Sequence, residues 1–160
     1  MAKPILFSLS IFLLSVFCTS LPVVPPASES MYTNFLNCFK QNNPDPSIPD
    51  IVLPQSNPSF PTVLQNYIRN ARFNTSSTSK PLIIVTPKQP SHVQSTVICA
   101  KQNNIQIKIR SGGHDYEGLS YISNQPAFIL LDMFNLRTIN VDIQKEVAYV
   151  QTDATLGEFR

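Results

Sequence analysis

Residues 107–118 read Ile107-Lys108-Ile109-Arg110-Ser111-Gly112-Gly113-His114-Asp115-Tyr116-Glu117-Gly118. Ile105, Ile107 and Ile109 alternate with polar residues, which is the period-2 pattern of a strand. The strand runs into two consecutive glycines in a chain that has only four. The turn then presents His114, one of two histidines, so backbone freedom and a reactive side chain meet at one place.

The residues before this stretch predict a βαβ unit and therefore an α/β fold. Residues 81–87 form a short apolar run fenced by prolines, typical of a strand buried on both faces. A helix is expected over 91–102, opened by a capping box of Ser91 and Gln94. The strands 81–87 and 105–110 should be parallel neighbours with a right-handed crossover. The apolar residues expected to share a helix face are Val93, Val97 and Ala100, with Ile98 beside them.

The residues after the loop predict one more buried strand and a hairpin. Residues 127–131 are fully apolar. Ile139, Val141 and Ile143 alternate with polar residues, and after a short polar turn 147–150 return as the hairpin partner. Residues 155–158 look like the first turn of a further helix. With no closing element, we expect a truncated chain in which a strand such as 127–131 lacks its covering layer.

The N-terminal residues predict a targeting signal. An apolar run over 5–17 follows Lys3 and precedes small residues, which is typical of a secretory signal peptide ending near residue 28. The run is shorter than the roughly 20 residues that span a bilayer, and prolines follow it, so no membrane anchor is expected. Helical spacing then places Tyr32, Phe35, Leu36 and Phe39 on one face of a short helix.

A proline-rich segment over 42–61 must be extended or turning and cannot be regular helix, and helical spacing resumes over 60–71. Signal removal leaves Cys38 and Cys99, which form either one disulfide or two buried thiols; a bridge would contribute roughly 4 kcal/mol. Asn74-Thr75-Ser76 is the usable glycosylation sequon.

Several classes of function are not supported. A net charge of +2 without a basic stripe argues against nucleic acid. His92 and His114 belong to different elements and no His/Cys cluster exists, so no metal site is expected. Nucleophile-elbow, Walker and dinucleotide fingerprints are absent from the sequence.

The glycine turn itself can hold an anion. It follows a parallel strand, where ligands of α/β sheets bind, and successive backbone N–H groups can cradle a diphosphate. Arg110 could add a charge and Ser111 a hydroxyl donor. A plain tight turn is the alternative. His114 could be a base, a metal ligand, a covalent attachment point or a partly exposed loop histidine.

Residues 110–121 closely resemble the flavin-attachment motif of the berberine bridge enzyme-like family of secreted plant FAD-linked oxidases. Further agreement lies in residues 35–39, 81–87, 91–94 and 154–158. The resemblance implies the N-terminal part of a vanillyl-alcohol-oxidase (PCMH-type) FAD-binding domain: an α/β (α+β) fold with a βαβ unit, a following hairpin and preceding helices. We divide the chain into a signal peptide (1–28), a helical and proline-rich wrapping segment (29–76) and a truncated FAD-binding domain (77–160).

The resemblance also implies the site. His114 would carry FAD covalently, Ser111, Gly112 and Gly113 would hold the diphosphate, and Arg110, Asp115 and Ser120 complete the expected cofactor-binding set. The family's disulfide matches Cys38 and Cys99. Asp153 stands where the family usually has glycine, so we expect backbone strain, if that position needs positive φ, and an added negative charge.

The implied activity is oxidation of a small organic substrate, with hydride passing to FAD and on to oxygen as hydrogen peroxide. A second cysteine link and the catalytic base are expected beyond Arg160, so no catalytic residue is assigned in this chain. We expect a monomer, secreted or vacuolar, with substrate and oxygen as its partners. The alternative is a non-catalytic truncated secreted relative without stable FAD binding, and the chain alone is expected to bind FAD weakly and to be inactive.

Overall fold

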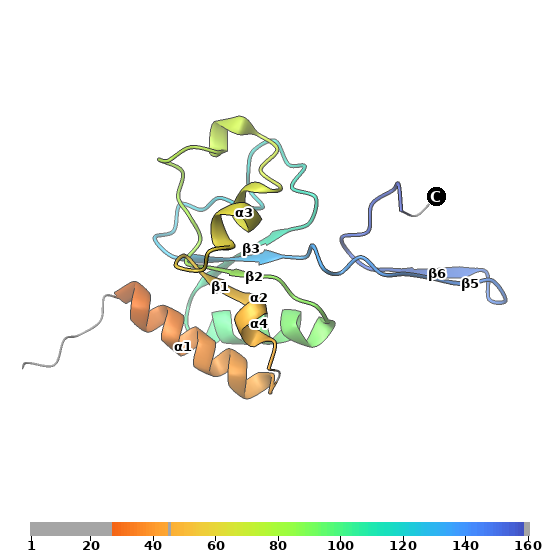
Figure 1. Ribbon diagram of the computed structural model, residues 1–160, viewed down its shortest axis with the longest axis horizontal. Coiled ribbons are helices and arrows are strands. Elements are labelled where there is room, and N and C mark those ends of the chain that lie inside the picture. Colours follow the sequence, from red (N-terminus) through yellow and green to blue (C-terminus); the bar gives the residue numbers. More distant parts are fainter. Residues whose placement is uncertain (1–26, 45, 159–160) are drawn as a thin grey trace, which may run out of the picture.

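A four-stranded sheet lies at the centre of the fold (Figure 1). The computed structural model describes residues 27–44 and 46–158, so nearly all of the expected signal peptide lies outside the described residues. Strand order is β1-β2-β4-β3. Strands β2, β4 and β3 are parallel to one another, and β1 is antiparallel to its neighbour β2. The expected α/β class is confirmed. The strands are β1 (Val52–Pro54), β2 (Ile83–Val85), β3 (Gln106–Arg110) and β4 (Phe128–Asp132).

The order of the strands corrects one prediction. β2 and β3 are parallel but are not neighbours, because β4 lies between them and pairs with both. Leu130 of β4 is opposite Ile84 on one side and Lys108 on the other. β4 is buried along its whole length, whereas β3 is partly exposed, so the more apolar strand takes the central place.

Helices cover both faces of the sheet, as the side view in Figure 1 shows. Helices α1 (Ala27–Asn42) and α4 (Pro90–Gln102) pack on one face, and α3 (Phe60–Gln65) lies on the other (Figure 1). The expectation that β4 lacks a covering layer is therefore wrong. The larger core includes Phe35, Phe39, Ile83, Val85, Cys99, Ile129 and Leu131, and the smaller core contains Leu53, Phe60, Ile84, Tyr121 and Leu130.

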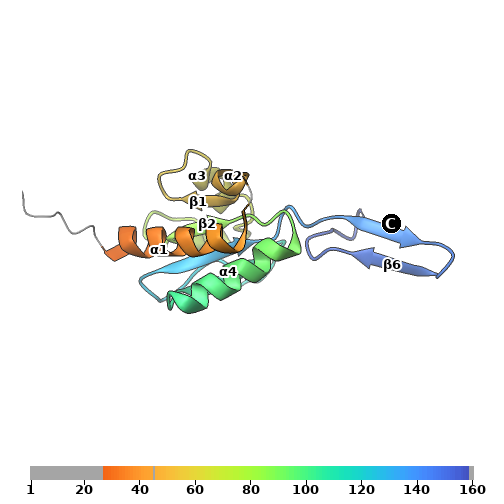
Figure 2. The same ribbon diagram turned by 90° about the horizontal axis from the view of Figure 1, so that it is seen from below.

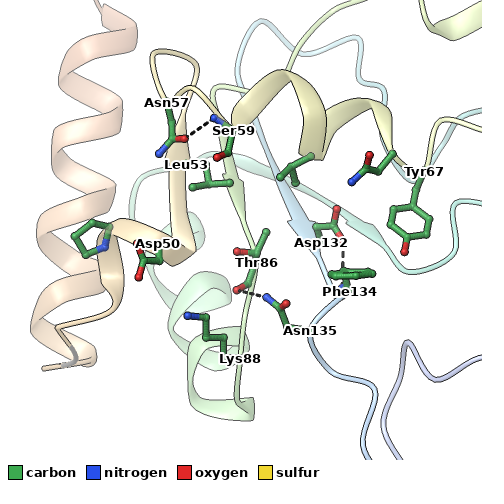
Figure 3. A pocket seen from close by; sticks show the side chains of 13 residues that line it. Asp50, Leu53, Asn57, Ser59, Tyr67, Thr86, Lys88, Asp132, Phe134 and Asn135 are labelled. Atoms are coloured by element: carbon green, nitrogen blue, oxygen red, sulfur yellow. Dashed lines mark hydrogen bonds between the residues drawn. The ribbon is translucent and has the colours of Figure 1, made fainter.

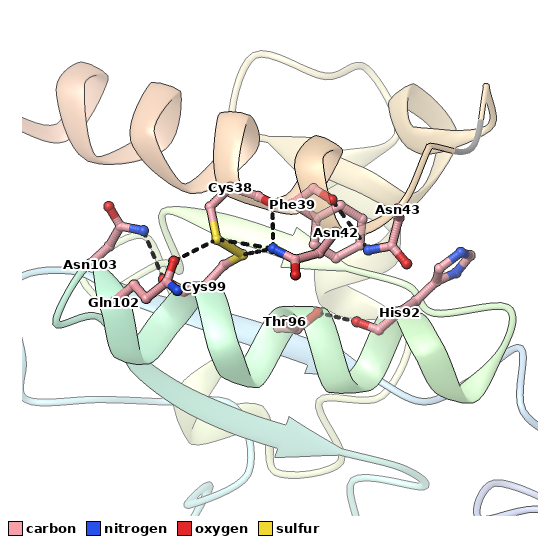
Figure 4. Close-up of a disulfide and its surroundings, with 9 residues drawn as sticks. All are labelled: Cys38, Phe39, Asn42, Asn43, His92, Thr96, Cys99, Gln102 and Asn103. Carbon is pink, nitrogen blue, oxygen red and sulfur yellow. Dashed lines mark hydrogen bonds between the residues drawn. A yellow bond between two sulfur atoms is a disulfide. The ribbon is translucent and has the colours of Figure 1, made fainter.

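A disulfide joins Cys38 of α1 to Cys99 of α4 (Figure 4). The structure thus has the bridge that the sequence left as one of two possibilities. The amide Nδ2 of Asn42 lies 3.6 Å from Sγ of Cys38 and 3.7 Å from Sγ of Cys99. The bridge holds the two covering helices together over one face of the sheet.

Helix α4 differs from the prediction in its N-terminal cap and in the face that it buries. Its N-cap is Gln89 and Pro90 opens the first turn, so Ser91 lies inside the helix and the expected capping box does not form. Val97 and Ile98 are exposed, by 47% and 38%, and the helix buries its polar side instead. Burying Thr96 is acceptable because its hydroxyl donates to the carbonyl oxygen of His92 at 2.7 Å. The buried residues are His92, Ser95, Thr96, Cys99 and Ala100.

The proline-rich segment contains more regular structure than expected. Helix α2 (Ile48–Ile51) is a single turn with proline in its first positions, where a missing N–H costs nothing. Strand β1 follows and ends at Pro54, which an edge strand tolerates. The next helix, α3, is shorter than the predicted 60–71, and a 3₁₀ turn, η1 (Ala71–Phe73), replaces its end.

The hairpin of β5 (Ile139–Asp142) and β6 (Val147–Val150) is confirmed, and it projects away from the sheet (Figures 1 and 2). Exposed apolar side chains lie here and not on β4, with Val141 and Tyr149 about 60% exposed. Residues 156–158 form a turn, not the expected helix, within the described range. Among the described residues, no helix combines the length and apolarity that a membrane crossing needs.

Candidate functional site

The loop after β3 is fixed by the segment that follows α3. Gly113 has φ +63°, and a Cβ there would collide with the carbonyl oxygen of Tyr67, so the position requires glycine. Nε of Arg69 donates to the carbonyl oxygen of Gly112 at 3.2 Å. Nδ2 of Asn70 donates to the carbonyl oxygen of Tyr116 at 2.8 Å. The glycine turn is therefore held at both ends by one segment.

Arg110 lies under the loop and not on its surface. Its side chain is fully buried, and Nη2 lies 2.5 Å from Oδ2 of Asp132. Nη1 donates to the carbonyl oxygen of Leu64 and Nη2 to that of Val63, both at 2.7 Å. The guanidinium thus ties the end of β3 to α3, and its placement does not fit the expected charge contact with a diphosphate.

Asp115 and Ser120, expected near the cofactor, face each other. The Asp115 carboxylate accepts hydrogen bonds from the backbone N–H of Leu119 at 2.5 Å, from that of Ser120 at 3.4 Å, and from the Ser120 hydroxyl. Both carboxylate oxygens are therefore used inside the loop. This arrangement shapes residues 115–120.

His114 stands on the wall of a cavity of about 490 Å³. Its side chain is exposed, and its ring lies against Gly112, where an added Cβ would come within 2.7 Å of its Cδ2. The loop contributes Ser111, Gly112 and His114 to the cavity, whereas Gly113 is buried behind it. The remaining lining residues are Tyr67, Arg69, Thr152, Asp153, Ala154, Thr155, Leu156 and Gly157.

No pattern in the sequence marks Tyr67 or Arg69 as a residue of the candidate site. Tyr67 was expected only on the face of a helix. In the structure its ring lies 5.4 Å from the guanidinium carbon of Arg69 and packs against Phe134 at 5.7 Å. Burial raises the pKa of Tyr67, and the negative charge of Asp153 adds to this. The Arg69 side chain donates a hydrogen bond to the loop from 43 positions away, and no local pattern could reveal such a contact.

Asp153 is buried on the cavity wall, with 7% of its surface exposed. Its backbone N–H donates to the carbonyl oxygen of Leu136 at 2.9 Å. The non-glycine residues with positive φ within the described ranges are Asn104 and Glu146, so the expected backbone strain at Asp153 is absent. Burial raises the pKa of Asp153, and Asp132 raises it further while Arg137 opposes the shift.

A second cavity, of about 410 Å³, opens at the carboxyl ends of β2 and β4 and also includes Tyr67 (Figure 3). Asn135 donates from Nδ2 to the carbonyl oxygen of Thr86 at 3.2 Å, and Asp132 Oδ1 accepts from the N–H of Phe134 at 3.1 Å. Both cavities lie where parallel α/β sheets bind ligands. Nothing in the sequence singled out this second cavity.

The residues of the His114 cavity suit a flavin nucleotide in two respects. The turn lines the cavity through Ser111 and Gly112, whose backbone groups can bind an anion, and the exposed imidazole is free to react. Asn74 of the sequon is exposed just after η1, as glycosylation requires. Across residues 27–44 and 46–158, no group of three or more His, Cys, Asp or Glu side chains could hold a metal ion.

Residues 81–160 match the family model described as a FAD binding domain. Berberine bridge enzyme-like 21 of Arabidopsis thaliana is 54% identical over 155 residues, which are 93% of this chain and 29% of that protein. Tetrahydroberberine oxidase of Berberis wilsoniae is 46% identical over 147 residues, which are 90% of this chain and 26% of that protein. The chain spans less than a third of the length of these curated relatives.

Solved structures show the same similarity. Phl p 4, a grass pollen allergen with glucose dehydrogenase activity, is 43% identical with a TM-score of 0.70, covering 78% of this chain and 25% of that one. A variant of berberine bridge enzyme is 35% identical with a TM-score of 0.69, covering 78% of this chain and 25% of that one. The chain therefore belongs to the berberine bridge enzyme-like family of FAD-binding proteins.

Proposed function

We propose that this chain supplies the flavin-anchoring part of a secreted FAD-dependent oxidase, with FAD joined covalently to His114. The observation that carries the proposal is the exposed His114 imidazole on the wall of a cavity of about 490 Å³, beside a glycine turn that Arg69 holds by a hydrogen bond to Gly112. The similarity of the chain to a tetrahydroberberine oxidase and to a glucose dehydrogenase supports a small organic substrate.

The residues of the chain divide the work of holding FAD. Backbone groups of Ser111, Gly112 and Gly113 would hold the diphosphate, and the imidazole of His114 would be the attachment point for the flavin ring. Asp115 and Ser120 keep the loop in shape, and Arg110 fixes it from below. Bound FAD supplies the redox chemistry, taking hydride from the substrate and giving hydrogen peroxide with oxygen.

The chain's own residues do not include the catalytic base under this proposal. We place the base, and a second flavin link through cysteine, in sequence beyond Arg160. The signal peptide is assigned to 1–28, the wrapping segment to 29–76 and the FAD-binding domain to 77–160. The disulfide and the exposed Asn74 support an extracellular or vacuolar destination, and we propose a monomer.

One observation favours the second candidate, a secreted relative without stable FAD binding. The buried carboxyl of Asp153 lines the cavity that would take an anionic cofactor. An ionised carboxylate there opposes the diphosphate, so weak binding by this chain follows from the same geometry that suggests the site.

Peptide mass spectrometry tests the proposal. Trypsin cleaves after Arg110 and Arg137 and releases residues 111–137 of the protein made with FAD. We expect this peptide to carry the mass of the flavin, and His114→Ala to remove it. Tyr116→Ala, a change at an 87% exposed side chain of the same loop, should leave the added mass in place. Fully bound flavin with an unmodified His114 would contradict covalent attachment, and the absence of flavin from every form supports the second candidate.

A further inference from the structure

Asp153 is the one acidic side chain on the wall of the His114 cavity within the described residues. The turn that carries it is held at its backbone, because the N–H of Asp153 donates to the carbonyl oxygen of Leu136. The backbone of this residue is therefore held at the cavity wall, and 7% of its surface is exposed. A carboxyl on a cavity wall acts on whatever enters the cavity.

The cations near Asp153 are already engaged. Arg137 donates from Nη2 to Oε1 of Glu158 at 2.7 Å, and Arg110 is bonded to Asp132. No ion pair or hydrogen bond joins the side chain of Asp153 to another side chain among residues 27–44 and 46–158. Within the described residues, the Asp153 carboxyl therefore lies on the cavity wall without an ion-pair partner.

The remaining charges around Asp153 divide into two groups. Asp132 and Glu158 disfavour a further negative charge at this position, whereas Arg137 and Arg110 favour it. Tyr67 faces the carboxyl as a neutral phenol near pH 7. Burial is the largest influence, and it raises the pKa of Asp153. Protonation of this carboxyl therefore occurs at a less acidic pH than for an exposed aspartate.

We infer that Asp153 sets the affinity of this cavity for flavins that carry phosphate: the neutral acid admits the diphosphate of FAD, and the carboxylate repels it. The inference rests on the proposed function. Like charges within one cavity of about 490 Å³ interact strongly because the medium between them is only partly aqueous. Riboflavin has the same ring and ribityl chain without phosphate, so its affinity should not depend on this charge.

Flavin binding to the whole chain tests the inference. Dissociation constants for FAD and riboflavin are measured by fluorescence quenching at pH 5 and pH 8 in a His114→Ala background, where binding stays reversible, with Asp153 either kept (wild type at this position) or changed by Asp153→Asn. At pH 8 we expect Asp153→Asn to bind FAD about tenfold more tightly than the wild type. At pH 5 the ratio should shrink. Riboflavin should bind the two proteins alike at both pH values.

Two further variants make the result interpretable. Asp142→Asn removes a carboxylate from the projecting hairpin and should leave FAD binding unchanged. Asp153→Ala removes the same charge with a different side chain, and circular dichroism with thermal melting confirms that each variant folds.

The outcomes separate the inference from the proposed function. Equal FAD affinity in wild type, Asp153→Asn and Asp153→Ala would overturn the inference while leaving the flavin site intact. A gain in riboflavin affinity as large as that in FAD affinity would also overturn it, since shape and not charge would be responsible. If no protein binds either flavin at either pH, the proposed function fails and the inference fails with it.

Discussion

Arg110 and Asp132 are register partners on β3 and β4, with Nη2 of the arginine 2.5 Å from Oδ2 of the aspartate and both side chains closed to solvent. The same guanidinium donates to two carbonyl oxygens of α3. A buried charge needs every such partner, because the interior does not solvate it. The pair therefore joins the start of the glycine loop, the centre of the sheet and the overlying helix.

Asp132→Asn should destabilise the fold strongly. The change leaves Arg110 buried with its charge uncompensated, which costs about 3 kcal/mol or more of the free energy of unfolding. Urea denaturation measures this loss. Asp142→Asn breaks the exposed pair with Lys145 and serves as the matched control, with no measurable change expected. An equal effect of the two substitutions would show that the buried pair contributes nothing special.

Gly113→Ala should disrupt the loop and its flavin attachment. The new Cβ would meet the carbonyl oxygen of Tyr67 at a backbone conformation that only glycine adopts easily, so we expect a loss of about 2 kcal/mol or more. Gly157→Ala is the control, because its Cβ would have no neighbour closer than 3.8 Å. Thermal melting and the flavin mass on residues 111–137 are the two measurements. A stable, fully flavinylated Gly113→Ala protein would contradict this account.

Local patterns in the sequence predicted most of the elements. Period-2 alternation predicted β3 and β5, the polar turn after β5 predicted β6 as its hairpin partner, and the short apolar runs predicted β2 and β4. The sequence could not reveal the order of strands, since the place of β4 between β2 and β3 depends on which strand gains most from two covered faces. The exposure of Val97 and Ile98 was not predicted either, because it depends on which face of α4 packs against the sheet.

The candidate site was predictable in its glycines and its histidine but not in its surroundings. A double glycine before a histidine carries its own signal, because few other positions need such backbone freedom. The sequence around Arg110 does not show whether its guanidinium is buried in the fold or contacts a ligand. The side chain points toward Asp132, which lies 22 positions later in the chain. Arg69 and Asn70 hold the loop by hydrogen bonds to carbonyl oxygens 43 and 46 positions later, and no local pattern in the sequence reveals such contacts.

The β5–β6 hairpin should exchange its amide hydrogens much faster than the central sheet. All four residues of β6 are exposed, whereas β2 and β4 are buried along their whole length. A two-stranded hairpin without a covering layer is marginally stable. Hydrogen exchange followed by mass spectrometry should show protection factors about 100-fold lower in 139–150 than in 128–132. Equal protection of the two segments would mean that the hairpin is covered in solution.

Removal of the disulfide should lower the free energy of unfolding by roughly 4 kcal/mol, because the bridge closes a loop of 61 residues in the unfolded chain. The paired change Cys38→Ala with Cys99→Ala tests this in urea. Reductant should destabilise the wild type and leave the double variant unaffected, which separates loss of the bridge from loss of packing. An unfolding midpoint that reductant does not move would rule out a stabilising bridge.

The turn at 155–158 should lose stability in acid when the carboxylate of Glu158 is protonated. Its carboxylate accepts the backbone N–H of Thr155 at 2.8 Å and pairs with Arg137. The pKa of Glu158 is lowered to about 2, and the hydrogen bond from the Thr155 backbone contributes most to this shift. Since the pKa is lower in the folded chain than in the unfolded one, the stabilising effect is present above about pH 4.5 and disappears as the pH falls through about 2.

The amide proton of Thr155 is the direct probe of that titration. Its chemical shift should stay constant from pH 7 to about pH 4 and change with a midpoint near the Glu158 pKa of about 2. Glu158→Gln should abolish this transition, because the amide oxygen accepts the same hydrogen bond at every pH. Arg137→Met should raise the midpoint toward the ordinary value for glutamate, since one of the groups that favour the carboxylate is removed. A midpoint that does not move in Arg137→Met would show that the Thr155 contacts alone lower the pKa of Glu158.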